Sequence, residues 1–179
     1  VTGSALPMPP MFSHQYTPAN SPLAEAIADG TPLTALSWIN AQPDPFTRSV
    51  CEVLLRGISG ASPATLFPEF ERLFDTAPTD HPQSEWLHNM LDIYLGVCAL
   101  RSNALDAALD SANRQYKIAR RSHNGLLTAQ ATLLGMEALH RQGETEQADA
   151  YRMQGALDCW AYGSRSGLTL LARWQPEEG

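Results

Sequence analysis

Residues 84–101 have the sequence SEWLHNMLDIYLGVCALR, in which large apolar residues recur at steps of three and four. These residues are Trp86, Leu87, Met90, Leu91, Tyr94, Leu95 and Cys98. Side chains at this spacing share one face of an α-helix, which completes a turn about every 3.6 residues. Ser102 and Asn103 follow and are typical of a tight turn. The stretch therefore predicts a helix that ends in a chain reversal.

The same pattern continues through the second half of the chain. It predicts helices over about 104–121, 126–141, 148–162 and 167–174. Asn124-Gly125 and Gly143 interrupt the pattern, and residues of these types readily adopt the left-handed backbone that ends a helix. Helices joined by turns of a few residues can only fold back on their neighbours.

Upstream, Ser or Thr followed by Pro at 21–22, 31–32 and 62–63 is typical of a helix start. Apolar spacing predicts helices from about 21, from about 31, over 46–58 and over 62–74. Pro68 predicts an irregular first turn or a kink in the last of these. No run of β-branched residues with period two occurs. We therefore expect an all-α fold of antiparallel helix pairs.

Residues 1–20 hold four prolines and few periodic apolar positions, so we expect an extended or disordered arm there. A single helical-repeat domain is expected over 21–179, a length that one domain can fill. No apolar run reaches the ~18 residues of a membrane span, and the first residues lack a secretory pattern. Three widely spaced cysteines argue against a disulfide framework. We expect a cytoplasmic protein.

The charge and the motifs narrow the function. A net charge of −7 argues against nucleic acid or an anionic membrane as the partner. The sequence has no nucleophile elbow, no phosphate-binding glycine loop and no HExxH motif. We therefore expect no enzyme and no cofactor.

Two segments share a layout: 95–108 (LGVCALRSNALDAA) and 135–148 (GMEALHRQGETEQA). Each has small residues in mid-helix, then Asn103 or Gly143 at the turn, then an alanine five residues later. Their offset of forty residues lies in the range of helical repeats. The chain here resembles the tetratricopeptide-repeat (TPR) family, including the superhelical regions attached to bacterial transcription regulators. The resemblance is best over 84–162 and only architectural over 21–76. The chain departs from the family in the place of its first-helix tryptophan, its period and the lack of a closing proline.

The resemblance implies a short TPR-like superhelix, an α–α solenoid, whose first helix in each pair lines a concave groove. The expected lining residues are Met90, Ile93, Val97, Leu100 and Arg101 from one repeat, and Gln130, Leu133, Glu137, His140 and Arg141 from the next. Such a mixture suits an amphipathic helix or an extended peptide of a partner. The alternative is that the apolar members pack on another helix and the polar members face water.

Two Glu-x-x-His steps, Glu85 to His88 and Glu137 to His140, are the strongest hint of a metal site. Two such steps with two more carboxylates build a di-metal centre in some helical bundles. Glu52 or Glu71 and Asp110 are the candidates for those carboxylates. Against this, Glu85 falls in a first turn and His140 in a last turn, where each simply suits the helix dipole. We expect no metal.

A charged stripe, formed by Asp106, Asp110, Arg114, Lys117 and Arg121, predicts a solvated helix face. The alternative is an anion site built by Arg114, Lys117, Arg120 and Arg121. The C-terminal end is apolar and aromatic through Trp160, Tyr162, Leu170, Leu171 and Trp174. These residues are expected to seal the last repeat, or to form a homodimer patch if the final helix leaves them open.

The leading hypothesis is an adaptor or chaperone-like module of a bacterial cytoplasm that binds a peptide or helix of a partner protein. The second hypothesis is a ligand-sensing, regulatory domain of a transcription or secretion system, with a small molecule between repeats. The third is a di-metal carboxylate enzyme.

Overall fold

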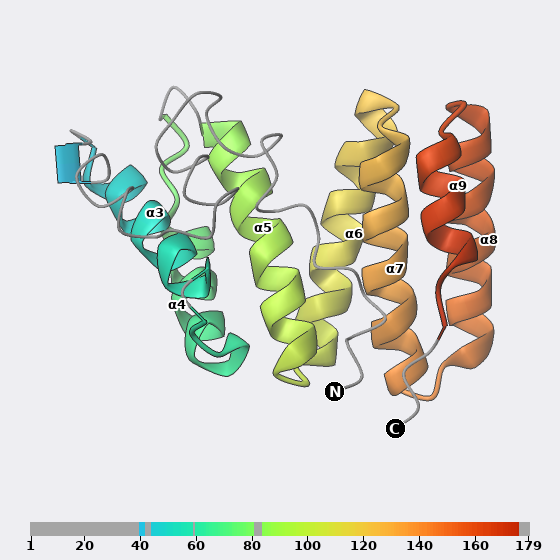
Figure 1. Cartoon of the computed structure of the whole chain (residues 1–179), viewed down its shortest axis with the longest axis horizontal. Coiled ribbons are helices and arrows are strands. Elements are labelled where there is room, and N and C mark those ends of the chain that lie inside the picture. The colour runs from blue at the N-terminus through green and yellow to red at the C-terminus, as the bar shows by residue number, and fades with distance from the viewer. Residues whose placement is uncertain (1–39, 42–43, 59, 81–83, 176–179) are drawn as a thin grey trace. The chain divides into compact units, whose positions relative to one another are not determined.

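The computed structural model describes residues 40–41, 44–58, 60–80 and 84–175. Within these ranges all regular secondary structure is helical and there is no strand (Figure 1). This confirms the all-α prediction for the part of the chain that is described. The arm expected over 1–20 and the helices expected between 21 and 39 lie outside these residues.

The described residues fall into two compact units. The N-terminal unit spans Pro10–Cys98 and the C-terminal unit includes Ala99–Gly179, so the boundary falls inside one helix. The single domain expected over 21–179 stays a prediction.

The N-terminal unit contains α3 (Pro45–Ile58), α4 (Pro63–Thr76) and most of α5 (Ser84–Arg101). The expected start of α4 is confirmed: the Ser62 side chain accepts a hydrogen bond from the backbone N–H of Thr65, and Pro63 occupies the first turn. The helix continues through Pro68 to Thr76. Its inner side buries Leu66, Phe70 and Leu73.

Pairs of side chains join the helices of this unit. Arg56 of α3 forms an ion pair with Glu69 of α4 at 2.6 Å. The ring of Phe70 in α4 stacks on Tyr94 of α5 at 5.2 Å between centroids. All residues of this unit from Leu91 to Cys98 are buried, and the charged Asp92 is among them.

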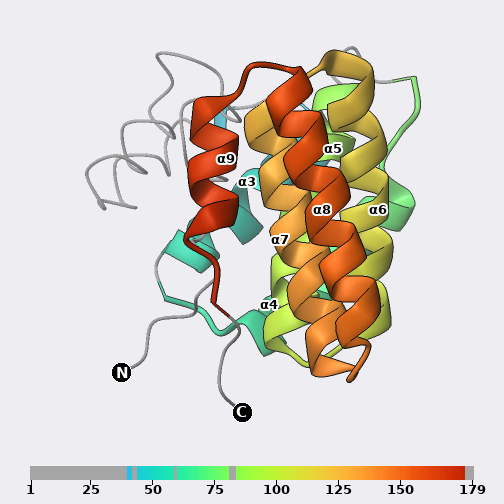
Figure 2. The same ribbon diagram turned by 90° about the vertical axis from the view of Figure 1, so that its right-hand side faces the viewer.

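The C-terminal unit is built from α6 (Leu105–Ser122), α7 (Gly125–Arg141), α8 (Thr145–Ala161) and α9 (Arg165–Ala172). Helix α7 is the central element: it packs against α6, α8 and α9, and α8 also packs against α9 (Figures 1 and 2). Every residue of α7 from Ala131 to Leu139 is buried. Successive helices run antiparallel because each turn is short.

One residue with positive φ reverses the chain at each turn of this unit. Asn103 has φ 60° and Gly143 has φ 84°, which confirms both expected turn positions. At the α6–α7 turn, the left-handed residue is His123 rather than Asn124 or Gly125. Asn124 instead caps α7, its side-chain oxygen accepting a hydrogen bond from the N–H of Leu127.

Glycines let α7 and α8 approach closely. A Cβ added at Gly155 of α8 would lie 2.6 Å from Cγ2 and 2.9 Å from Cβ of Thr132 in α7. A Cβ added at Gly135 of α7 would lie 2.7 Å from the Tyr151 ring of α8. Neither position has room for a side chain.

Candidate functional site

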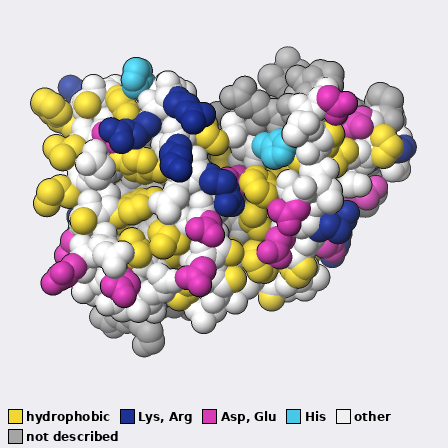
Figure 3. Space-filling model, turned by 180° about the vertical axis from the view of Figure 1, so that it is seen from behind, with side chains coloured by type: hydrophobic (Ala, Val, Ile, Leu, Met, Phe, Trp, Pro, Cys, Tyr) yellow, Lys and Arg dark blue, Asp and Glu magenta, His cyan; other side chains and the backbone are white. Residues whose placement is uncertain are grey.

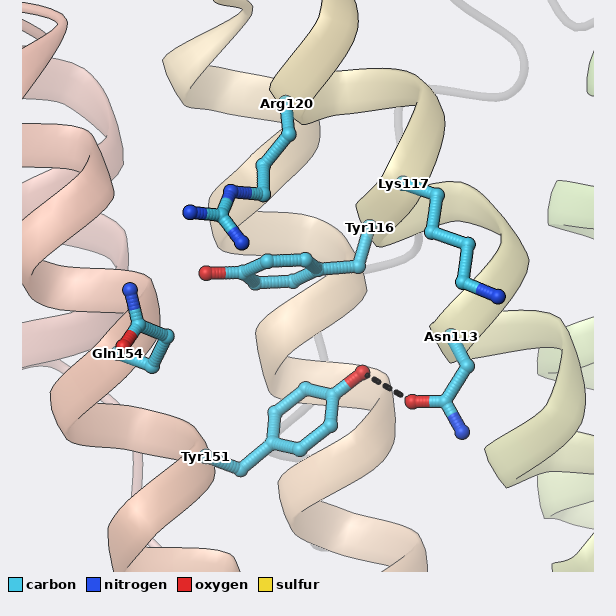
Figure 4. A pocket seen from close by; sticks show the side chains of 6 residues that line it. All are labelled: Asn113, Tyr116, Lys117, Arg120, Tyr151 and Gln154. Atoms are coloured by element: carbon cyan, nitrogen blue, oxygen red, sulfur yellow. Dashed lines mark hydrogen bonds between the residues drawn. The ribbon is translucent and has the colours of Figure 1, made fainter.

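Basic side chains gather over one end of α6 on the surface of the C-terminal unit (dark blue, left half of Figure 3). Next to them is a hollow of about 380 Å³ between α6 and α8, with α7 behind it (Figure 4). It is lined by Asn113, Tyr116, Lys117, Arg120, Tyr151 and Gln154. The two tyrosines are half-buried and the other four residues are exposed, so the hollow is open to solvent.

The two tyrosines form the aromatic part of the hollow. The rings of Tyr116 and Tyr151 meet edge to face at 5.7 Å between centroids and 67° between planes, an arrangement that aromatic quadrupoles favour. The Tyr151 hydroxyl donates to Oδ1 of Asn113 at 3.0 Å (Figure 4). The glycine at 135 leaves the space in which the Tyr151 ring lies.

A carboxylate holds the base of the hollow together. Asp158 of α8 is 8% exposed and accepts a hydrogen bond from the Tyr116 hydroxyl. Its Oδ1 accepts a hydrogen bond from Gln154 at 3.2 Å, and its Oδ2 lies 3.6 Å from Nε of Arg120. Three side chains, those of Tyr116, Gln154 and Arg120, therefore stabilise the charge of Asp158.

The rim of the hollow is cationic. Asp158 is paired inside, whereas the Arg120 side chain is 58% exposed and Lys117, the sole lysine of the chain, is also exposed. Arg120 pairs with Asp158, so an incoming carboxylate would meet one further positive charge, that of Lys117, and the amides of Asn113 and Gln154. Arg and Lys bind carboxylates most strongly where water is partly excluded.

Burial raises the pKa of several groups in this unit. The pKa of Tyr116 lies above its usual 10.0 because of burial and then because its hydroxyl donates to Asp158. Burial also raises the pKa of Tyr151. Burial, and then the charge of Asp158, raise the pKa of Cys159 to about 11. All three groups are neutral at neutral pH.

We expect the C-terminal unit to lose stability in alkali. Because these groups have a higher pKa in the folded state than in the unfolded state, their contribution is complete below the unfolded values of 9.0 for cysteine and 10.0 for tyrosine. It is lost as the pH rises through the folded values. In thermal melting followed by circular dichroism, these groups should leave the melting temperature unchanged up to about pH 9 and should lower it above that pH.

The variant Tyr151→Phe should soften that fall, because one titrating group is removed while the ring remains. An equal alkaline fall in Tyr151→Phe, Tyr116→Phe and the unchanged protein would show that these tyrosines do not cause it.

The residues expected to line a concave groove are mostly covered. Among them, Ile93, Val97, Leu100, Leu133 and Glu137 are buried, Gln130, His140 and Arg141 are partly exposed, and Arg101 is exposed. The side chain of Met90 lies outside the described residues. None of the nine described members lines the hollow between α6 and α8. Their binding role stays a prediction.

Four of these residues meet in one cluster with Trp174. Glu137 is fully buried and accepts hydrogen bonds from Nε of Arg141 at 3.1 Å and from the Trp174 indole at 3.2 Å. Arg141 also donates to the carbonyl oxygen of Leu100 at 3.2 Å. The ring of His140 meets that of Trp174 edge to face. This cluster fixes the chain after α9 against α7.

The aromatic C-terminal end thus divides into two parts. Trp174 contacts α7, Leu171 is buried and Tyr162 meets His123 at 5.1 Å between ring centroids. These residues seal the unit, as expected. Trp160 is 73% exposed and does not.

The two Glu-x-x-His steps fall in different units. His88 meets Phe74 edge to face in the N-terminal unit, and the Glu85 side chain is not described. Glu137 is already engaged by Arg141 and Trp174. Among the described residues, no group of three or more His, Cys, Asp or Glu is placed to hold a metal ion.

The charged stripe on α6 has mixed surroundings. Asp106 accepts a hydrogen bond from Gln142 at 2.7 Å, and Asp110, Lys117 and Arg121 are exposed. Lys117 and Arg120, from the alternative anion site, both line the hollow.

Comparison of the chain with models of protein families, with curated proteins and with solved structures finds no match. In the described part of the chain, no helix is both long and apolar enough to cross a membrane. Function must therefore be inferred from the geometry of the units themselves.

Proposed function

We propose that the chain is a protein-interaction module, a helical repeat similar to the TPR family, that holds a segment of a partner protein. We place the segment in the hollow between α6 and α8. We propose a bacterial cytoplasm as its location, which is supported by three buried cysteines that form no disulfide, Cys51, Cys98 and Cys159. The proposal is for binding rather than catalysis and needs no cofactor.

The observation that carries the proposal is the open hollow with an aromatic wall and a cationic rim. Tyr116 and Tyr151 offer ring surface and hydroxyls, which suits peptide recognition. Lys117 and Arg120 favour a negative partner. The lining side chains can be reached from solvent, whereas five of the ten residues of the expected concave groove are buried.

The partner segment should combine an acidic side chain with an apolar or aromatic one. Its carboxylate would approach the exposed Lys117, while its apolar side chain covers the tyrosine rings. Gln154 and Asn113 offer polar contacts for its backbone. A helix or an extended peptide could present such a pair of side chains.

Selection of random peptides displayed on phage tests this proposal. Peptides that bind the immobilised protein should be enriched in Asp or Glu beside an apolar residue. Their affinity, measured by fluorescence anisotropy with synthetic peptides, should fall about tenfold in Lys117→Glu, the equivalent of about 1.4 kcal/mol. Salt should weaken binding. The matched control Arg173→Glu reverses an exposed charge outside the hollow and should leave affinity unchanged.

The sole lysine gives a second readout. An amine-reactive ester can modify only Lys117 and the terminal amine, so a bound peptide should slow modification of Lys117 alone, as followed by mass spectrometry. Selected peptides without acidic residues, or with equal affinity for Lys117→Glu, would contradict the proposed site.

A small-molecule sensor is the second candidate, and the volume of the hollow favours it, since about 300 to 1,000 Å³ is usual for such sites. A panel of aromatic carboxylic acids would raise the melting temperature of the unchanged protein, but not of Lys117→Glu, if that candidate is correct.

A further inference from the structure

The outward side of α8 carries three large hydrophobic side chains that water reaches. Met153, Leu157 and Trp160 are 67%, 55% and 73% exposed. Steps of four and three residues place them on one side of the helix. Ala148 and Cys159, on the opposite side, are buried in the unit. Helix α8 is therefore apolar on two sides, one of which has no cover from the described residues.

This apolar stripe lies along an outer edge of the C-terminal unit. Helices α8 and α9 are nearest the viewer in Figure 2, with α7 behind them. In Figure 3, hydrophobic side chains gather at the left edge, where α8 runs. A contiguous apolar patch at such an edge is typical of a surface that binds another protein.

The two ends of the stripe carry opposite charges. Glu146 and Asp149 are exposed in the first turns of α8. They lie seven and four residues before Met153, respectively, and so on the same side of the helix. Beyond the other end of α8, the exposed Arg165 begins α9. Arg120 lies at that end too, because it pairs with Asp158 in the last turn of α8.

We propose that this side of α8 binds the same side of α8 in a second copy of the chain, with the two helices antiparallel. A twofold axis midway between Met153 and Trp160 would place Met153 beside Trp160 of the partner subunit and bring the two copies of Leu157 together. Such an interface is self-complementary, as twofold symmetry requires.

Charge favours a second copy over an unrelated partner. In the antiparallel arrangement Asp149 approaches Arg165 of the partner subunit, and the reverse contact repeats on the other side of the axis. The two helix dipoles also oppose one another favourably. A parallel arrangement would set acid against acid and base against base.

Sedimentation equilibrium over a range of concentrations tests the proposal with the full chain. The mass of the unchanged protein should rise with concentration from 19.5 kDa toward twice that value. Leu157→Glu should stay monomeric and keep its melting temperature at low concentration, because Leu157 is 55% exposed. Lys117→Glu should associate like the unchanged protein, which separates this interface from the hollow.

Exchanging the charges of Asp149 and Arg165 tests whether the two α8 helices are antiparallel. Asp149→Arg and Arg165→Glu should each weaken association about tenfold, and the double variant should recover most of that loss because acid and base have changed places. A chain that stays monomeric at all concentrations, association unaffected by Leu157→Glu, or a double variant weaker than both single variants would overturn the antiparallel dimer.

Discussion

Ala108→Asp should destabilise the C-terminal unit by about 4 kcal/mol, since an unpaired buried charge costs about 3 to 5 kcal/mol. Ala108 has no exposed surface in α6, which packs directly on α7. A carboxylate there would lose its hydration inside the unit, with no partner to replace it. Chemical denaturation and thermal melting should both record the loss, the second as a fall of roughly 15 °C or more.

Two controls separate charge burial from other effects of this change. Ala150→Asp adds the same side chain at an exposed position of α8 and should change stability by no more than about 0.5 kcal/mol. Lowering the pH should recover part of the loss in Ala108→Asp, because a neutral carboxyl group costs less to bury. Melting of Ala108→Asp like that of the unchanged protein would mean that α6 does not pack on α7 as described.

Gly155→Val should destabilise the unit by about 3 kcal/mol, at the upper end of the usual cost of overpacking. The first atom of the new side chain would fall within 2.6 Å of Cγ2 of Thr132, so α8 would have to move away from α7. That movement would also separate the tyrosine rings. We therefore expect weaker peptide binding together with a lower melting temperature.

The double change Gly155→Ala with Thr132→Ala tests whether Thr132 is the residue that a side chain at position 155 would contact. Thr132→Ala removes the two nearest side-chain atoms and leaves only Cβ at 2.9 Å, so Gly155→Ala should cost less in that background. Equal costs in both backgrounds would place the clash elsewhere. Ala150→Val, at an exposed position of the same helix, controls for the β-branched side chain.

Local chemistry explains why the helices could be predicted. Ser62 and Pro63 start α4 by a cap and a fixed φ, and Asn103 and Gly143 end helices by positive φ. Each of these signals acts within a few residues. His123 shows the limit, because it takes the left-handed conformation although the sequence indicated Asn124 and Gly125 as the break.

The hollow could not be predicted in the same way. Tyr116 and Asp158 are forty-two residues apart and meet only because α6 and α8 both pack on α7. Each of the two tyrosines, Tyr116 and Tyr151, lies at helical spacing from apolar residues of its own helix, which indicates packing. Nothing in the neighbouring sequence shows that each hydroxyl reaches a residue of the other helix. The local hint in the sequence is that the sole lysine directly follows Tyr116. The burial that gives the tyrosine hydroxyls their partners comes from packing between helices.

The glycine contacts between α7 and α8 also fix the shape of the hollow before a ligand binds. Because Gly135 meets Tyr151 and Gly155 meets Thr132, the two helices cannot slide past each other without a collision at one point or the other. Tyr151 is thus held in place before any ligand arrives. A site with its walls already set requires little reorganisation on association, so more of the contact energy appears as affinity.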